Sequence, residues 1–209
     1  ADRIEAEVGG GDYRAFVDSA PVLERAVAER AGLGWIAKNT MLINVKAGSW
    51  FFLGEIFTNL PLPLDEPHTS KHCGTCTACL DICPTAAFTG PFQLDARKCI
   101  SYLTIEHHGS IDPVLRPLLG NRIFGCDDCQ LCCPWNKFAQ RSPLPDFDER
   151  IGSDSLLALW AWGEPEFLRR TEGSPIPFSR VFIRPRITND AAGFTPIPAA
   201  GYPAEPRPQ

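Results

Sequence analysis

Hydrophobic and polar residues follow a helical period near the start of the chain. Asp18 and Ser19 precede Pro21, which is typical of a helix start, and Gly32 can end the helix. The apolar positions between these signals form one stripe: Val22, Leu23, Ala26, Val27 and Ala31. The pattern therefore predicts one helix, with Asp18 beside its N-terminus.

Two segments farther along have the composition of strands. Residues 40–45 and 49–60 look extended and are rich in Phe, Ile and Trp, and Lys46-Ala47-Gly48 between them suits a tight turn. We expect the two segments to form a β-hairpin. Together with the helix, the hairpin makes α+β the expected class of this part of the chain.

Prolines divide the chain into regions. Residues 61–67 contain too many prolines to continue a helix or a central strand. Residues 154–170 have a helical, aromatic pattern, whereas residues 175–209 hold eight prolines and no sustained period, which favours an irregular or disordered tail. The expected regions are 1–62, 63–145, 146–174 and 175–209.

Composition narrows the class of protein. With 209 residues, 44% of them hydrophobic, the chain can bury a core, and its net charge of −5 argues against a general nucleic-acid coat. Any RNA contact must be local. The longest apolar run, residues 49–54, is too short to span a bilayer, and residues 1–7 lack a secretory signal. We expect a cytoplasmic chain without a membrane span.

Cysteine is the residue type that departs from an average composition. All nine cysteines lie between Cys73 and Cys133. In a reducing compartment such a group indicates metal binding before disulfides. The run Cys73-x-x-Cys76-x-x-Cys79-x-x-x-Cys83-Pro84 is the full bacterial ferredoxin motif for a 4Fe-4S cluster.

The remaining cysteines supply a second cluster. Two cubane clusters need eight thiolates, so one of the nine cysteines is spare. Cys133 precedes a proline as Cys83 does, which makes Cys133 the better ligand for the first cluster and leaves Cys132 spare. The predicted ligands are Cys73, Cys76, Cys79 and Cys133 for the first cluster, and Cys83, Cys99, Cys126 and Cys129 for the second. One or two zinc sites are the alternative.

Several motifs outside the ferredoxin run carry a resemblance to a known family. They are FVDSAPVLER at 16–25, AGLGWI at 31–36, FFLGE at 51–55, LDARKCISYLTIE at 94–106, GNRIFGCDDCQL at 120–131 and CPWN at 133–136. With these motifs the chain closely resembles the epoxyqueuosine reductase family, cobalamin-dependent iron-sulfur enzymes of queuosine biosynthesis. The resemblance covers roughly residues 13–174.

The resemblance implies a fold and a reaction. It implies part of a cobalamin-binding α/β domain, then a bacterial-type double 4Fe-4S ferredoxin-like domain and an irregular tail. In the family, two clusters feed a reduced cobalamin that removes the epoxide oxygen of epoxyqueuosine in the anticodon loop of tRNA. The clusters need an external electron donor. We expect a monomer.

The resemblance also assigns residues. Asp18 matches the family's proton donor, a role that requires a raised pKa. The positions where corrinoid contacts would fall are Leu42, Leu53, Ser101 and Asp127. Arg122 could meet cobalamin or a tRNA phosphate, or form a structural ion pair. The histidines match no family ligand and are expected at the surface: His68, His72, His107 and His108.

The chain also departs from the family pattern. We expect a fragment that lacks the family's N-terminal part and its C-terminal helical repeats, and a shifted reading frame would explain the Pro-rich tail. Ala26 and Ala37 stand where the family commonly has Pro and Gly, and Cys132 is extra. Two other functions compete: a corrinoid iron-sulfur reductive dehalogenase, and a ferredoxin-type electron carrier, for which the cysteine segment alone would suffice.

Overall fold

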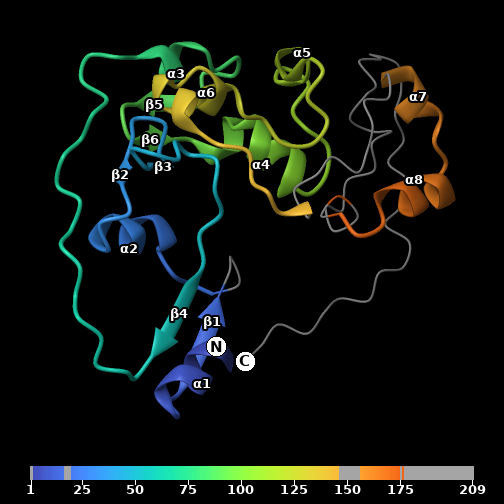
Figure 1. Ribbon diagram of the computed structural model, residues 1–209. Coiled ribbons are helices and arrows are strands. Elements are labelled where there is room, and N and C mark those ends of the chain that lie inside the picture. The colour runs from blue at the N-terminus through green and yellow to red at the C-terminus, as the bar shows by residue number, and fades with distance from the viewer. Residues whose placement is uncertain (1, 17–19, 146–155, 175, 177–209) are drawn as a thin grey trace.

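The computed structural model describes residues 2–16, 20–145, 156–174 and 176. Its first half contains two helices and two small antiparallel sheets (Figure 1). The elements are α1 Asp2–Val8, β1 Tyr13–Phe16, α2 Glu24–Arg30, β2 Trp35–Ile36, β3 Leu42–Ile43 and β4 Glu55–Thr58. Strand β1 pairs with β4, and β2 pairs with β3. The mixed helix and strand content confirms the expected α+β class.

The predicted helix is present but packs differently from the prediction. Helix α2 covers Glu24–Arg30, and Gly32 has a φ of +72°, which suits a residue just past a helix end. Its buried residue is Ala28, whereas Leu23 and Val27 are 79% and 44% exposed. Two of the five predicted stripe residues are therefore exposed, while Val22, Ala26 and Ala31 are half-buried. Asp18 lies outside the described residues.

The predicted β-hairpin is wrong, although its turn forms. Asn44 and Gly48 exchange two backbone hydrogen bonds of 2.8 and 2.9 Å, and Gly48 has a φ of +67°. The chain then separates, because Asn136 accepts a 2.6 Å hydrogen bond from the Ser49 amide. Ser49 therefore bonds to the Asn136 side chain from the cysteine region and not to a neighbouring strand. Strands β3 and β4 find their partners elsewhere, in β2 and β1.

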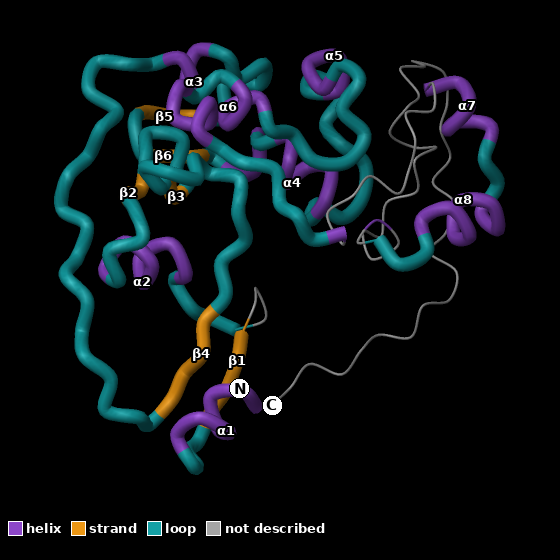
Figure 2. Tube along the Cα trace, viewed as in Figure 1, coloured by secondary structure: helices purple, strands orange, loops and turns teal. Residues whose placement is uncertain are grey.

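A long loop joins the two halves. Residues 59–77 contain no helix or strand, as the prolines predict, and run along one side of the molecule from β4 to α3 (Figure 2). The loop is fastened by a 2.9 Å hydrogen bond from the His68 amide to the Glu29 carbonyl of α2. The loop therefore packs against the first half before it reaches the first cysteine.

The second half consists of short elements around the cysteines. They are α3 Ala78–Asp81, β5 Phe88–Gly90, β6 Gln93–Leu94, the 3-10 helix η1 Ala96–Lys98, α4 Ile100–Ile105, α5 Arg116–Leu119, α6 Asp128–Leu131 and the 3-10 helix η2 Pro134–Phe138. Helices α3 and α6, which each carry a cysteine, contact each other. The helical pattern of residues 154–170 is confirmed by α7 Leu156–Ala161 and α8 Glu164–Thr171. The predicted irregular tail lies outside the described residues, apart from Ile176.

Two small hydrophobic cores back the two cysteine groups. One consists of Trp35, Ala37 and Ile43 and has Cys73 and Cys133 packed against it. The other has Cys126 packed against it and is built from Ile100, Leu103, Ile111 and Leu119. Burial of apolar side chains thus holds the backbone on which each cysteine group sits. No helix in the described part of the chain combines the length and apolar character that a bilayer span requires.

Candidate iron-sulfur centre

The four cysteines predicted for the first cluster line one cavity. Three of them come from the loop before α3 and from α3 itself, and the fourth precedes η2. The lining cysteines are Cys73, Cys76, Cys79 and Cys133, with Lys38, Asn39, His72 and Trp135 among their neighbours. The fold therefore brings Cys133 from the second motif to the first, as the sequence predicts.

The charges of these thiols interact. The pKa of Cys79 is raised to about 11, first by burial and then by Cys132, Cys133 and Cys73. The free thiol is thus protonated near neutral pH. Because a metal binds the thiolate, loading of this site releases protons.

Three of the predicted second-cluster cysteines also interact. The pKa of Cys129 is raised to about 12, first by burial and then by Cys99 and Cys126. Burial also raises the pKa of Cys126, with smaller contributions from Asp128 and Cys99. Cys79 and Cys132 also contribute to the pKa of Cys129, so Cys129 lies near both cysteine groups.

Cys83 is held by contacts of another kind. Its sulfur accepts a 3.4 Å hydrogen bond from the Ala87 amide and lies 3.5 Å from the Thr85 hydroxyl. Hydrogen bonds to sulfur tune the potential of an iron-sulfur cluster. The membership of Cys83 in the second set stays a prediction, and so does the spare role of Cys132, whose sulfur lies 3.7 Å from the Cys129 carbonyl.

The donor set fits iron-sulfur clusters. Among the described residues, no three His, Cys, Asp or Glu side chains are placed to hold one metal ion. The first four thiols line a cavity of about 80 Å³ together with other side chains, among them Lys38 and Trp135. Thiolates around a space of this kind are what a polynuclear iron-sulfur cluster requires.

An aromatic group beside the first cavity was missed by sequence reasoning. Trp35 is fully buried, with ring centroids 5.5 Å from His68, 4.7 Å from His72 and 5.0 Å from Trp135. The surface prediction is wrong for His68, which is half-buried and buries its Nε2 atom, whereas His72 is exposed as predicted, although it also lines the cavity. The position of His72 directly before Cys73 was the available signal. His108 is exposed as expected, and His107 contacts the Ser110 carbonyl.

Glu55 is a second residue that the sequence did not single out. It lies opposite Phe16 in the β1–β4 pair, where β1 leads into the Asp18 segment. Its Oε2 atom is buried and has no hydrogen-bond partner within the described residues. Burial, and next the charge of Glu24, raise the pKa of this carboxyl.

The four residues predicted to contact a corrinoid lie on different elements. Leu42 in β3 is buried, Leu53 before β4 and Ser101 in α4 are half-buried, and Asp127 before α6 is exposed. The described structure does not gather them in the first cavity. Their role stays a prediction. Arg122 forms an ion pair with Asp128, which is the structural alternative that the sequence left open.

A comparison with models of protein families matches the region that holds the cysteines. Residues 72–136 match the model of a 4Fe-4S double cluster binding domain. This match covers both cysteine groups and the connection between them.

Curated relatives match a larger part of the chain. Epoxyqueuosine reductase of Pseudomonas aeruginosa is 64% identical over 178 residues, which is 84% of this chain and 49% of the relative. Epoxyqueuosine reductase of Xanthomonas campestris is 66% identical over 178 residues, which is 84% of this chain and 50% of the relative. The chain thus spans about half the length of these relatives.

Solved structures show the same likeness. A crystal structure of epoxyqueuosine reductase with an epoxyqueuosine-modified tRNA-Tyr stem loop has a TM-score of 0.75 at 36% identity, covering 88% of this chain and 49% of that one. Epoxyqueuosine reductase from Bacillus subtilis, with its catalytic loop swung out of the active site, has a TM-score of 0.74 at 35% identity and the same coverage.

Proposed function

We infer that this chain belongs to the epoxyqueuosine reductase family and carries the part of such an enzyme in which two 4Fe-4S clusters pass electrons to cobalamin. The reaction is the reduction of epoxyqueuosine in the tRNA anticodon loop to queuosine, the final step of queuosine biosynthesis. The cavity shared by Cys73, Cys76, Cys79 and Cys133 is the observation that carries this proposal. The relatives of the same name, which match 84% of the chain, support it.

The chain's own residues would have two tasks. Cys73, Cys76, Cys79 and Cys133 would hold the first cluster, and Cys83, Cys99, Cys126 and Cys129 the second. A reduced cobalt would supply the electrons that open the epoxide. Leu42, Leu53, Ser101 and Asp127 would contact the corrinoid.

Asp18 would deliver the proton that the departing oxygen needs. Support comes from the B. subtilis structure, whose catalytic loop is identified by an aspartate. Glu55 lies opposite Phe16 near the end of β1, and burial raises the pKa of its carboxyl.

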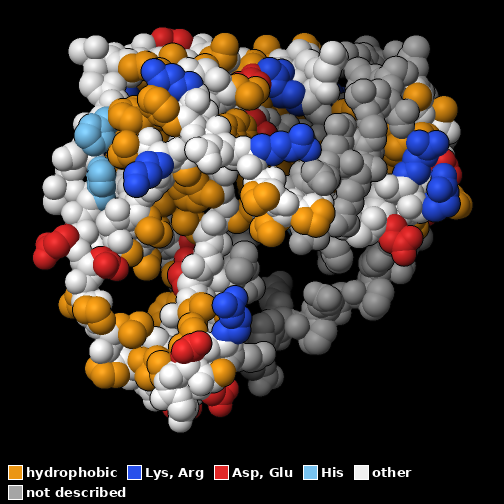
Figure 3. Space-filling view, in the orientation of Figure 1, with side chains coloured by type: hydrophobic (Ala, Val, Ile, Leu, Met, Phe, Trp, Pro, Cys, Tyr) orange, Lys and Arg blue, Asp and Glu red, His pale blue; other side chains and the backbone are white. Residues whose placement is uncertain are grey.

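Recognition of tRNA would depend more on shape than on charge. On the face drawn in Figure 3, Lys and Arg side chains are interspersed with Asp and Glu rather than gathered in one patch. The net charge of −5 agrees with this pattern. A pocket for an extruded base is consistent with chemistry on a nucleobase substituent. We expect the chain to act as a monomer that takes electrons from an external donor.

An assay on modified tRNA tests the function. The chain is purified without oxygen, loaded with iron, sulfide and cobalamin, reduced with dithionite, and mixed with an epoxyqueuosine-containing stem loop. Mass spectrometry should show loss of one oxygen from the modified base. The P. aeruginosa relative serves as positive control, and Asp18→Asn should remove the product while iron content is unchanged.

The alternative functions give different results. A plain electron carrier would load iron but would neither bind cobalamin nor change the tRNA. A reductive dehalogenase would bind cobalamin and release halide from an organohalide while the tRNA stays unchanged. Protein that loads no iron would overturn all three readings.

A further inference from the structure

A strained turn follows β2 and lies beside the cysteines. The Ala37 amide donates a 2.9 Å hydrogen bond to the Met41 carbonyl, and the Thr40 amide donates a 2.8 Å hydrogen bond to the Ala37 carbonyl. Thr40 has a φ of +64°, which is unfavourable for a β-branched residue. Arg25 of α2 donates a hydrogen bond to the Thr40 carbonyl. Strain of this kind persists where the surrounding structure requires one backbone path.

Lys38, in this turn, contacts the loop that carries Cys73 and Cys76. The Lys38 ammonium donates hydrogen bonds of 2.7 Å to the Gly74 carbonyl and 2.9 Å to the Cys76 carbonyl. The Lys38 carbonyl accepts a 3.0 Å hydrogen bond from the Phe92 amide. A positive charge is thus held against the backbone of one predicted cluster ligand.

Asn39, the next residue of the turn, contacts the segment that carries Cys129. The Asn39 side chain is buried, with 2% of the residue exposed, and its Nδ2 atom donates a 3.0 Å hydrogen bond to the Cys129 carbonyl. Its Oδ1 atom accepts a 3.2 Å hydrogen bond from the Met41 amide. Two neighbouring residues of one turn therefore contact one predicted ligand of each cluster.

We propose that Lys38 and Asn39 are positioning residues that fix the two cysteine loops relative to each other and thereby control electron passage between the clusters. This inference rests on the proposed presence of two clusters. Groups outside the ligand shell orient the ligands and tune the metal. The ammonium of Lys38 stabilises the more negative, reduced state of the first cluster, while Asn39 aligns the Cys129 loop without adding charge.

Two substitutions separate the two contacts. Lys38→Met removes the ammonium and keeps most of the side-chain volume at a half-exposed position. Asn39→Asp keeps the shape, removes the amide donor to the Cys129 carbonyl and introduces a negative charge. Asn44→Asp is the matched control, because the Asn44 amide donates to the Leu33 carbonyl rather than to a cysteine loop.

The readout is a redox titration of the iron-loaded full chain, followed by electron paramagnetic resonance without corrinoid or tRNA. The signal that Cys133→Ser removes belongs to the first cluster. Lys38→Met should lower the midpoint potential mainly of the first cluster, whereas Asn39→Asp, which places its charge between the first cavity and the Cys129 carbonyl, should lower the potentials of both clusters. Asn44→Asp should leave both at the wild-type potentials.

The spin–spin interaction of the two reduced clusters gives a second measurement. It should weaken in Asn39→Ala, which adds no charge and serves if Asn39→Asp loses iron. Wild-type potentials and wild-type interaction in iron-loaded Lys38→Met and Asn39→Ala would overturn the proposal. Because no substrate is used, absence of reductase activity would leave this result valid, whereas absence of two clusters would overturn both proposals.

Discussion

At the scale of single residues, Gly34 shows how closely the first core is packed. A Cβ atom added there would lie 2.1 Å from the Ile43 carbonyl oxygen, a backbone atom that cannot turn aside. We expect Gly34→Ala to lower the free energy of unfolding by about 3 kcal/mol, because β3 must move. Thermal unfolding of the loaded protein measures the effect.

Gly90→Ala is the control for this prediction. An added Cβ at Gly90 would meet its nearest neighbouring atom at 3.9 Å, an ordinary van der Waals distance. The unfolding temperature of Gly90→Ala should stay close to that of the wild-type protein. Equal stability of Gly34→Ala and Gly90→Ala would show that β3 can shift without cost.

Arg122 and Asp128 form an ion pair beside a predicted ligand of the second cluster. Arg122 donates hydrogen bonds to Asp128 and a 3.1 Å hydrogen bond to the Leu119 carbonyl. The two charges act on the neighbouring Cys126 with opposite sign. We expect Arg122→Gln to lower the midpoint potential of the second cluster and Asp128→Asn to raise it, as a redox titration would measure.

The double variant tests whether charge is the cause. Arg122→Gln with Asp128→Asn should return the potential toward the wild type, because both charges are removed. Each single variant should cost no more than about 1 kcal/mol of stability, since the pair is partly exposed. Potentials that move in the same direction in both single variants would indicate distortion of the loop instead.

Sequence reasoning anticipated which residues lie together where their proximity depends on spacing. Two residues separate Cys73 from Cys76 and Cys76 from Cys79, so the chain itself limits their separation. It was less successful for His68, which reaches Trp35 through tertiary packing that no local pattern encodes. Lys38 and Asn39 are polar residues in a turn, and only the fold shows that they contact the cysteine loops.

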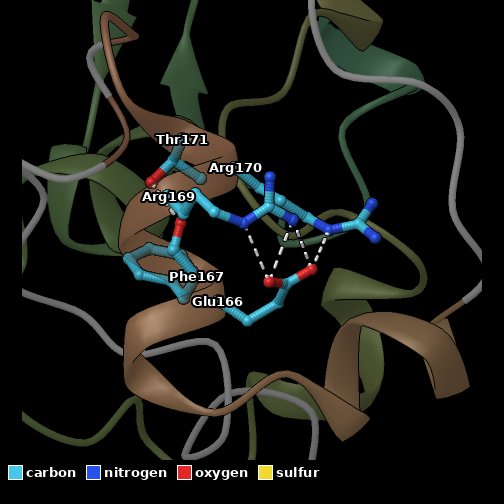
Figure 4. A network of polar contacts seen from close by, with 5 residues as sticks. All are labelled: Glu166, Phe167, Arg169, Arg170 and Thr171. Carbon is cyan, nitrogen blue, oxygen red and sulfur yellow. Dashed lines mark hydrogen bonds and ion pairs between the residues drawn. The ribbon is translucent and has the colours of Figure 1, made fainter.

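At the scale of elements, helix α8 owes part of its stability to one carboxylate. Glu166 accepts hydrogen bonds from Arg169 and Arg170, one turn ahead on the same face (Figure 4). These arginines lower the pKa of Glu166 to about 2, Arg169 more than Arg170. Because the pKa is lower in the folded state, the contribution is present above the unfolded pKa of 4.5 and is lost as the pH falls toward 2.

Substitution of Glu166 should remove this pH dependence. We expect amide hydrogen exchange of residues 164–171 to speed up from about pH 5 to about pH 3 relative to its intrinsic rate in the wild type, but not in Glu166→Gln. Glu164→Gln, in the first turn of the same helix, is the control and should keep the wild-type profile. An unchanged profile in Glu166→Gln would contradict a role for the network.

The elements were predicted unevenly for a physical reason. The turn of residues 46–48 is local, and its backbone hydrogen bonds form as expected. The partner of each strand is not local, since a hydrogen bond from Ser49 to Asn136 separates the segments that would have formed the hairpin. Likewise, helix α2 forms where the sequence predicts a helix, but which of its faces is buried depends on the segments that pack against it.

At the scale of the whole molecule, the second cysteine motif contributes one residue to the cavity of the first. Cys133 belongs to the second motif in sequence but lines the cavity of the first three cysteines. It therefore connects the end of α6 to the loop before α3. Loading of the first cluster should then stabilise both segments at once, since binding energy at such a site is also folding energy.

The last prediction distinguishes the neighbouring cysteines at this connection. Cys133→Ser should lose the first cluster, so that iron falls from about eight to about four atoms per chain, and should lower the unfolding temperature of the anaerobic protein. Cys132→Ser is the matched control and should keep both, because the Cys132 sulfur lies against the Cys129 carbonyl and is not among the cysteines that line the cavity. Iron and sulfide analysis together with the optical spectrum measures the outcome. Loss of iron in Cys132→Ser with full iron in Cys133→Ser would show that Cys132 is the ligand and Cys133 the spare cysteine. The proline that follows Cys133 would then not mark a cluster ligand.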